Sequence, residues 1–166
     1  KVECYWDNAA TTQAYEDVCE LVVKVMREDY GNPSSLHMKG VEGEKYVREA
    51  ADRIAKTLKC QRKNIVFSSG GTESNNIAVF GAAHAMKRKG KKLVVSSVEH
   101  PSVSRAFETL EEEGFTVVRL PVDRYGVVPV EEIENAVDEN TVLVSMMAVN
   151  NELGSVEPIE ALSRIV

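Results

Sequence analysis

The sequence is poor in cysteine and has neither a long apolar run nor an excess of basic residues. Cys4, Cys19 and Cys60 lack the spacing of metal or redox motifs, and an odd count without a secretory leader indicates reduced thiols in a cytosol. No run approaches the ~20 apolar residues of a membrane-spanning helix. The net charge of −6 argues against nucleic-acid binding, which requires a basic face. These absences favour a cytoplasmic protein that binds neither membranes nor nucleic acid.

Two common phosphate-binding fingerprints are also absent, namely the nucleotide P-loop and the Gly-x-Gly-x-x-Gly dinucleotide motif. The segment 65–76 nevertheless predicts an anion cradle, since a short apolar strand ends in a small-residue turn and opens a helix. Gly70 and Gly71 would let the backbone approach a ligand closely, and the helix N-terminus would offer unpaired N–H groups to a phosphate. An ordinary strand-to-helix turn with Thr72 as its cap explains the same residues.

Hydrophobic patterning predicts an alternating series of helices and strands. We expect helices at 14–29, 39–58, 72–89, 101–113, 130–138 and from about Pro158, and strands at 64–68, 93–96, 115–122 and 141–147. Strands rich in β-branched residues that alternate with helices predict an α/β fold, with helices flanking a mainly parallel sheet. Thr12 reads as the N-cap of the first helix, and Cys19 and Cys60 read as packing residues. The last helix has no C-terminal cap, so we expect the chain to be the first part of a larger protein.

Three polar clusters follow predicted strands, at 68–74, 96–101 and 150–154. Ligands of open parallel sheets bind at the carboxyl ends of strands, so we expect an anion cradle, an imidazole and a carboxamide to meet at one edge. His100 could stack on an aromatic cofactor or act as an acid or base, or it could simply cap the next helix. Asn151 could orient a ligand, although an Asx turn at this pair of asparagines is the alternative.

Five segments with few apolar residues occur in a fixed order along the chain. They are Asp-Asn-Ala-Ala-Thr-Thr at 7–12, Tyr-Gly-Asn-Pro-Ser-Ser at 30–35 with His37, Phe-Ser-Ser-Gly-Gly-Thr-Glu-Ser at 67–74, Val-Glu-His at 98–100 and Val-Asn-Asn-Glu-Leu-Gly at 149–154. Together they resemble the NifS/IscS-type cysteine desulfurases, which are pyridoxal-5′-phosphate (PLP) enzymes of the class V aminotransferase superfamily. The resemblance covers essentially the whole chain.

The resemblance implies roles for four residues. Gly71 and Thr72 look like donors to the PLP phosphate, and His100 looks like the imidazole that stacks on the pyridine ring and takes part in proton transfer. Asn151 looks like the side chain that contacts the ring's 3′-oxygen and the substrate carboxylate. No metal ligand is implied. The fold would be the fold type I large domain of PLP enzymes, with 1–35 as an N-terminal arm, helix and loop and 36–166 as a partial PLP-binding domain.

The activity implied is conversion of L-cysteine to L-alanine, with sulfur passed as a persulfide to an acceptor protein for iron–sulfur cluster or thio-cofactor assembly. A cytoplasmic homodimer is implied as well. The family's Schiff-base lysine, pyridinium aspartate and persulfide cysteine match no residue here, so we expect these 166 residues alone to be inactive. Another class V enzyme, such as an aminotransferase or a selenocysteine lyase, and a non-catalytic scaffold are the alternatives.

Overall fold

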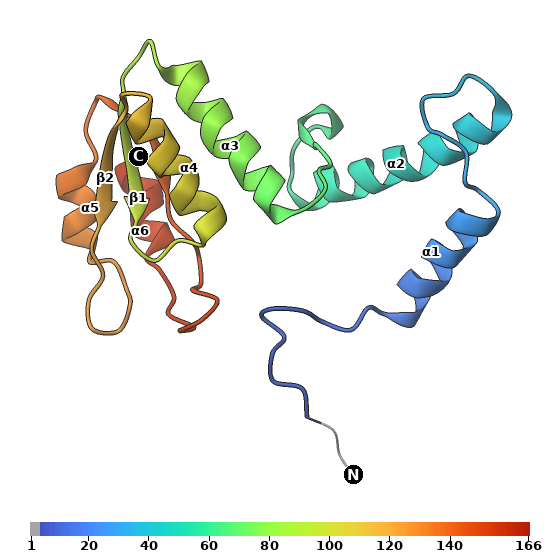
Figure 1. The fold of residues 1–166 in the computed structure, drawn as a ribbon, viewed down its shortest axis with the longest axis horizontal. Helices are drawn as coiled ribbons and strands as arrows, with labels where there is room; N and C mark the ends of the chain where they lie inside the picture. Colours follow the sequence, from blue (N-terminus) through green and yellow to red (C-terminus); the bar gives the residue numbers. More distant parts are fainter. Residues whose placement is uncertain (1–3) are drawn as a thin grey trace. The chain divides into compact units, whose positions relative to one another are not determined.

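The computed structural model describes residues 4–166, and the chain divides after Phe67 into two units (Figure 1). The first unit contains helices α1 (Glu16–Arg27) and α2 (Met38–Thr57) and the short 3₁₀ helix η1 (Arg62–Asn64). Both α-helices were predicted from their apolar periodicity. The first unit has little core of its own, because α1 has no buried residue and α2 buries only small ones.

Three predictions in the first unit are wrong. Thr12 does not cap α1; Tyr15 holds the N-cap position, and its side chain makes no capping bond. Cys19 and Cys60 are exposed rather than packed, and within residues 4–166 the helix that carries Cys19 has no buried residue. An apolar stripe on a helix therefore does not by itself locate buried residues.

The second unit carries the α/β fold. Its elements are α3 (Gly71–Met86), β1 (Lys92–Ser96), α4 (Pro101–Glu112), β2 (Thr116–Leu120), α5 (Val130–Ala136), β3 (Thr141–Ser145) and α6 (Ile159–Ile165). The strands form a sheet in the order β2-β1-β3, and both pairings are parallel. Parallel neighbours need a crossover between them, which α4 and α5 supply. The predicted parallel sheet with flanking helices is confirmed.

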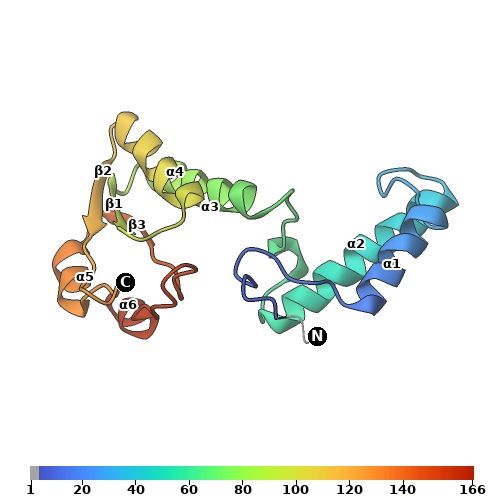
Figure 2. The same ribbon diagram turned by 60° about the horizontal axis from the view of Figure 1, so that its bottom comes forward.

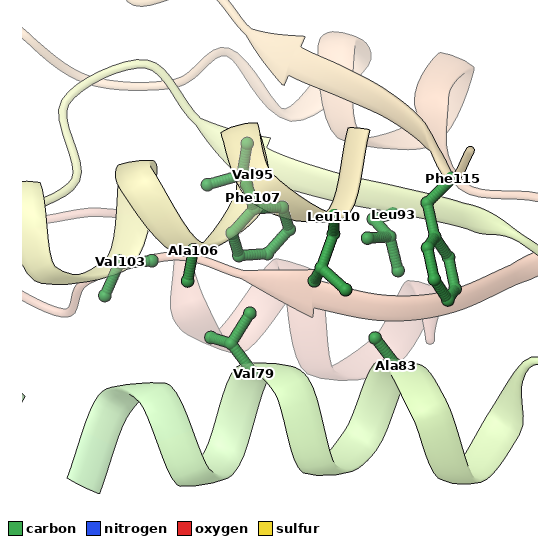
Figure 3. Close-up of a cluster of buried hydrophobic side chains, with 9 residues drawn as sticks. All are labelled: Val79, Ala83, Leu93, Val95, Val103, Ala106, Phe107, Leu110 and Phe115. Carbon is green, nitrogen blue, oxygen red and sulfur yellow. The ribbon is translucent and has the colours of Figure 1, made fainter. Parts of the chain in front are cut away.

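The two faces of the central strand β1 are buried against different helices. Leu93 and Val95 point to a cluster with side chains of α3 and α4, which Figure 3 shows. Val94 points to a second cluster, which contains Leu120 of β2 and Ile133 of α5. Figure 2 shows the same arrangement, with α3 and α4 on one side of the sheet and α5 and α6 on the other. Burial on both faces explains why the strands read as nearly continuous β-branched runs.

The strand predicted at 64–68 does not form. Residues 62–64 make η1, and the residues that follow have no regular structure up to the start of α3. Val66 is 71% exposed and Phe67 52% exposed. A strand requires a hydrogen-bonded neighbour, and in the described residues neither edge of the three-stranded sheet pairs with this segment. Within residues 4–166, moreover, no helix combines the length and apolar character needed to cross a bilayer.

Truncation of a core leucine should show where the stability resides. Leu110 is completely buried between the sheet and α3, so Leu110→Ala should lower the free energy of unfolding by about 2–5 kcal/mol. Leu36 is fully exposed and serves as the matched control, since Leu36→Ala should change stability by less than about 0.5 kcal/mol. Urea unfolding followed by circular dichroism measures both. Equal effects of the two substitutions would contradict the described core.

Candidate functional site

The carboxyl ends of β1 and β3 lie together, as the parallel pairing requires. The Oε1 atom of Glu99 accepts hydrogen bonds from the Met147 N–H at 2.5 Å and from the Ser96 hydroxyl at 3.0 Å. The Nδ2 of Asn150 donates to the Val98 carbonyl at 3.2 Å. These bonds tie the segment after β1 to the segment after β3. A pocket of about 350 Å³ lies between residues 98–101 and 150–153.

His100 is the N-cap of α4, and its exposed ring lines this pocket. Its Nδ1 accepts a hydrogen bond from the backbone N–H of Ser102 at 3.1 Å, and the Ser102 hydroxyl lies 2.8 Å from the same atom. An N–H group can only donate, so the neutral imidazole carries its proton on Nε2. The alternative that His100 caps the next helix is therefore confirmed. This capping bond leaves Nε2 and the ring face available to a ligand.

The Asx turn and the ligand-orienting role expected at this loop fall to different residues, Asn150 and Asn151. Asn150 makes the Asx turn, because its Oδ1 accepts from the N–H groups of Glu152 and Leu153, each at 2.9 Å. Asn150 is 7% exposed. Asn151 is exposed and lines the pocket, and within the described residues its side chain makes no hydrogen bond. The carboxamide of Asn151 is thus available to a ligand, while that of Asn150 shapes the loop.

The start of α3 is an open helix terminus. Gly70 is its N-cap, so the prediction of Thr72 as the cap is wrong, and Thr72 lies in the first turn with its side chain exposed. The Ser74 N–H is the first to reach a carbonyl of the chain, that of Gly70, at 3.0 Å. The N–H groups of residues 71–73 therefore have no intrahelical partner. A Cβ added at Gly70 or Gly71 would meet no atom within 4 Å.

Glu73 stabilises the turn that precedes α3. Its Oε2 accepts hydrogen bonds from the Ser69 hydroxyl and from the Ser69 N–H, each at 2.6 Å. These bonds favour the ionised carboxylate and hold the pKa of Glu73 below its usual value. The hydroxyls of Ser68 and Ser74 lie 2.6 Å apart and close the same turn. The helix terminus is thus ordered by its own side chains, as in a capping box.

A hydrogen bond joins the start of α3 to the start of α4. The Nδ2 of Asn75 donates to the Ser102 hydroxyl at 2.8 Å. Ser102 in turn contacts His100, which shares its pocket with Asn151. Hydrogen bonds therefore link α3 through Ser102 to His100, and a shared pocket links His100 to the loop after β3. Among the described residues, no group of His, Cys, Asp and Glu side chains is suited to hold a metal ion.

Sequence reasoning missed three residues of this arrangement. Asn75, Glu99 and Ser102 each lay within a described segment or helix, and none was assigned a role. The signal was present in one case, since a glutamate directly before a histidine at a strand end is well placed to reach the neighbouring strand. For Asn75 and Ser102 there was no signal, because their contact joins residues that lie 27 positions apart.

Comparison with known proteins gives consistent matches. The family described as aminotransferase class-V matches residues 4–166. A curated relative, the cysteine desulfurase IscS of Dictyoglomus turgidum, is 44% identical over 165 residues, which are 99% of this chain and 42% of the relative. The chain therefore spans about two fifths of the length of such relatives. The sequence resemblance to this family is confirmed.

Two solved structures show the same fold. One, named NifS-like protein, has a TM-score of 0.94 at 39% identity and covers 99% of this chain and 45% of its own. The other, SspA in complex with cysteine, has a TM-score of 0.89 at 34% identity and covers 97% of this chain and 46% of its own. The fold predicted from the sequence is therefore shared with solved proteins over nearly the whole chain.

Substitution of the two asparagines should separate their roles. Asn150→Ala leaves the Glu152 and Leu153 N–H groups without an acceptor and should lower the free energy of unfolding by about 1–3 kcal/mol. Asn151→Ala removes an exposed side chain and should change it by less than about 0.5 kcal/mol. Urea titrations compare the two variants. A larger effect from Asn151→Ala would refute the division of roles.

Acid should loosen the turn before α3. Because the folded-state pKa of Glu73 is lowered, the stabilisation from its bonds to Ser69 is complete above the ordinary value of 4.5 and is lost as the pH falls through the lowered value. The NMR shift of the Ser69 amide should therefore titrate below pH 4.5. Glu73→Gln should abolish this titration. A Ser69 shift that titrates equally in both proteins would disprove the contact.

Proposed function

Because the chain belongs to the aminotransferase class-V family, we propose that it is the N-terminal part of a PLP-dependent cysteine desulfurase, which converts L-cysteine to L-alanine and passes sulfur on as a persulfide. The single observation that carries the proposal is the connected site, in which hydrogen bonds link α3 to the imidazole of His100 and that imidazole shares a pocket with the free carboxamide of Asn151. The names of the relatives support the choice of reaction, and the cysteine complex of SspA supports the choice of substrate.

The residues present fit the three parts of PLP. Its phosphate matches the start of α3, where three N–H groups are free of helical partners and a Cβ added at Gly70 or Gly71 would meet no atom within 4 Å. Its ring matches the exposed face of His100. Its phenolic oxygen and a substrate carboxylate match the Asn151 carboxamide, which both donates and accepts. When bound, PLP supplies the electron sink that this class of reaction requires.

Each residue has a distinct task in the proposed site. Gly71 and Thr72 would hold the phosphate through a backbone N–H and a hydroxyl. His100 would lie against the ring and would donate a hydrogen bond from its Nε2–H to a reacting group within reach. Asn151 orients the substrate. Glu99 and Asn150 keep the loops that carry these side chains at a fixed separation.

The remaining parts of the reaction are proposed for the longer protein. A Schiff-base lysine, an aspartate for the ring nitrogen and a persulfide cysteine would come from segments outside these 166 residues. The proposal includes a cytoplasmic homodimer that delivers sulfur to an acceptor protein. Cys4, Cys19 and Cys60 are all exposed, but none resembles the family's nucleophile in its sequence context.

Replacement of His100 tests the proposal in the protein encoded by the whole gene. Wild-type protein with PLP should release alanine from L-cysteine, and His100→Ala should lower kcat by about 10²–10³-fold, the usual loss when one hydrogen-bond donor to a reacting group is removed. The matched control is His84→Ala, because His84 pairs with Glu113 at the opposite end of α3. Release of alanine, measured by chromatography, should be nearly unchanged in the control. A wild-type protein that forms no alanine, or a fully active His100→Ala, would overturn the proposal.

A further inference from the structure

A directed chain of hydrogen bonds runs from α3 to the imidazole of His100. Asn75 Nδ2 lies 2.8 Å from Ser102 Oγ, and Ser102 Oγ lies 2.8 Å from His100 Nδ1. The Ser102 N–H reaches the same Nδ1 at 3.1 Å. Asn75 and Ser102 are both partly buried, whereas His100 is exposed. Two partly buried side chains, those of Asn75 and Ser102, thus hold the exposed imidazole of His100 through hydrogen bonds.

The direction of every bond in the chain follows from one backbone group. The Ser102 N–H can only donate, so His100 Nδ1 must accept and carries no proton. A hydroxyl near a proton-free nitrogen gives its single hydrogen to that nitrogen. Ser102 Oγ therefore donates to Nδ1 and must accept from its other neighbour, the Asn75 amide. The Ser102 N–H and hydroxyl share the single lone pair of Nδ1, and the orientation of the Asn75 amide follows from this assignment.

We propose that Asn75 and Ser102 are positioning residues, which fix the ring orientation and the Nε2–H tautomer of His100 and link that ring to the helix whose N-terminus receives the phosphate. The bond from the Ser102 N–H alone would leave the exposed ring free to tilt about a single contact. The hydroxyl adds a second contact from a different direction, and Asn75 prevents the hydroxyl from rotating away. The catalytic meaning of this link rests on the proposed function, whereas its geometry does not.

Ring nitrogen NMR of the 166-residue chain tests the geometry. At about pH 8 an ordinary histidine is neutral, and long-range ¹H–¹⁵N spectra distinguish a protonated from a bare ring nitrogen. Wild-type His100 should show a bare Nδ1 and a protonated Nε2. Ser102→Ala and Asn75→Ala should move both nitrogens toward the average of the two tautomers, and Ser102→Thr, which keeps the hydroxyl, should restore the wild-type pattern.

Ser104→Ala is the matched control, because Ser104 lies on the same helix and within the described residues its side chain makes no hydrogen bond. It should give the wild-type spectrum. A wild-type ring with its proton on Nδ1 would overturn the proposal. So would a Ser102→Ala spectrum identical to that of the wild type.

A double-mutant cycle in the whole protein tests the catalytic meaning. Ser102→Ala should lower kcat for L-cysteine by about tenfold, as expected for one lost hydrogen bond, and should leave KM nearly unchanged. If Ser102 acts through the imidazole, the same change should cost nothing further in a His100→Ala background. Losses that multiply in the double variant would contradict the positioning role. Complete absence of desulfurase activity in the wild type would instead refute the proposed function, and the NMR result would still decide the geometry.

Discussion

Parallel pairing of β1 with both of its neighbours is the constraint on which the site depends. β1 is the central strand and is buried on both faces, so its direction and register are firmly set. Because β3 runs in the same direction, the residues that follow the two strands emerge at the same edge. Glu99 and Asn150 then tie those segments together with bonds to backbone groups. Without this pairing, His100 and Asn151 would not line one pocket.

In each polar cluster, the atoms that stabilise the local backbone differ from the atoms that are available to a ligand. His100 caps a helix with Nδ1 and keeps Nε2 free. Asn150 forms the turn, and Asn151 is left exposed beside it. Glu73 orders the approach to α3 through Ser69 and leaves the first N–H groups of the helix unpaired. At His100, at the Asn150–Asn151 pair and at the start of α3, a structural role and a ligand-binding role are therefore compatible, and evidence for one is not evidence against the other.

Much of this arrangement could be predicted from the sequence, because its causes are local. Helical periodicity located α1 to α6, and β-branched runs located the three strands that are buried between helices. The expectation that polar clusters after strands converge holds for the segments after β1 and β3, since it follows from their parallel pairing, but the cluster at 68–74 follows no strand. The errors share a different cause. The strand at 64–68 and the packing of Cys19 depended on partners that the described residues do not provide, and no local pattern reports a missing partner.

The helix caps and the Asn75–Ser102 contact could not be predicted from the sequence for another reason. Thr12 and Thr72 are good capping residues by type, but backbone geometry selected Tyr15 and Gly70 instead. Ser102 is small, polar and next to a proline at a helix start, so it resembles an ordinary first-turn residue. Its role depends on the packing of α3 against α4, which brings the Asn75 side chain within hydrogen-bond distance of the Ser102 hydroxyl. Tertiary packing, rather than residue type, decides these details.

The most direct test of the central claim is a crystal structure of the protein with PLP bound. We expect the phosphate at the N-terminus of α3 within hydrogen-bond distance of the Gly71 or Thr72 donors, the ring against His100 and its phenolic oxygen beside Asn151. We also expect Nδ1 of His100 still to face Ser102. A cofactor bound elsewhere, or one that turns the imidazole away from Ser102, would contradict the account.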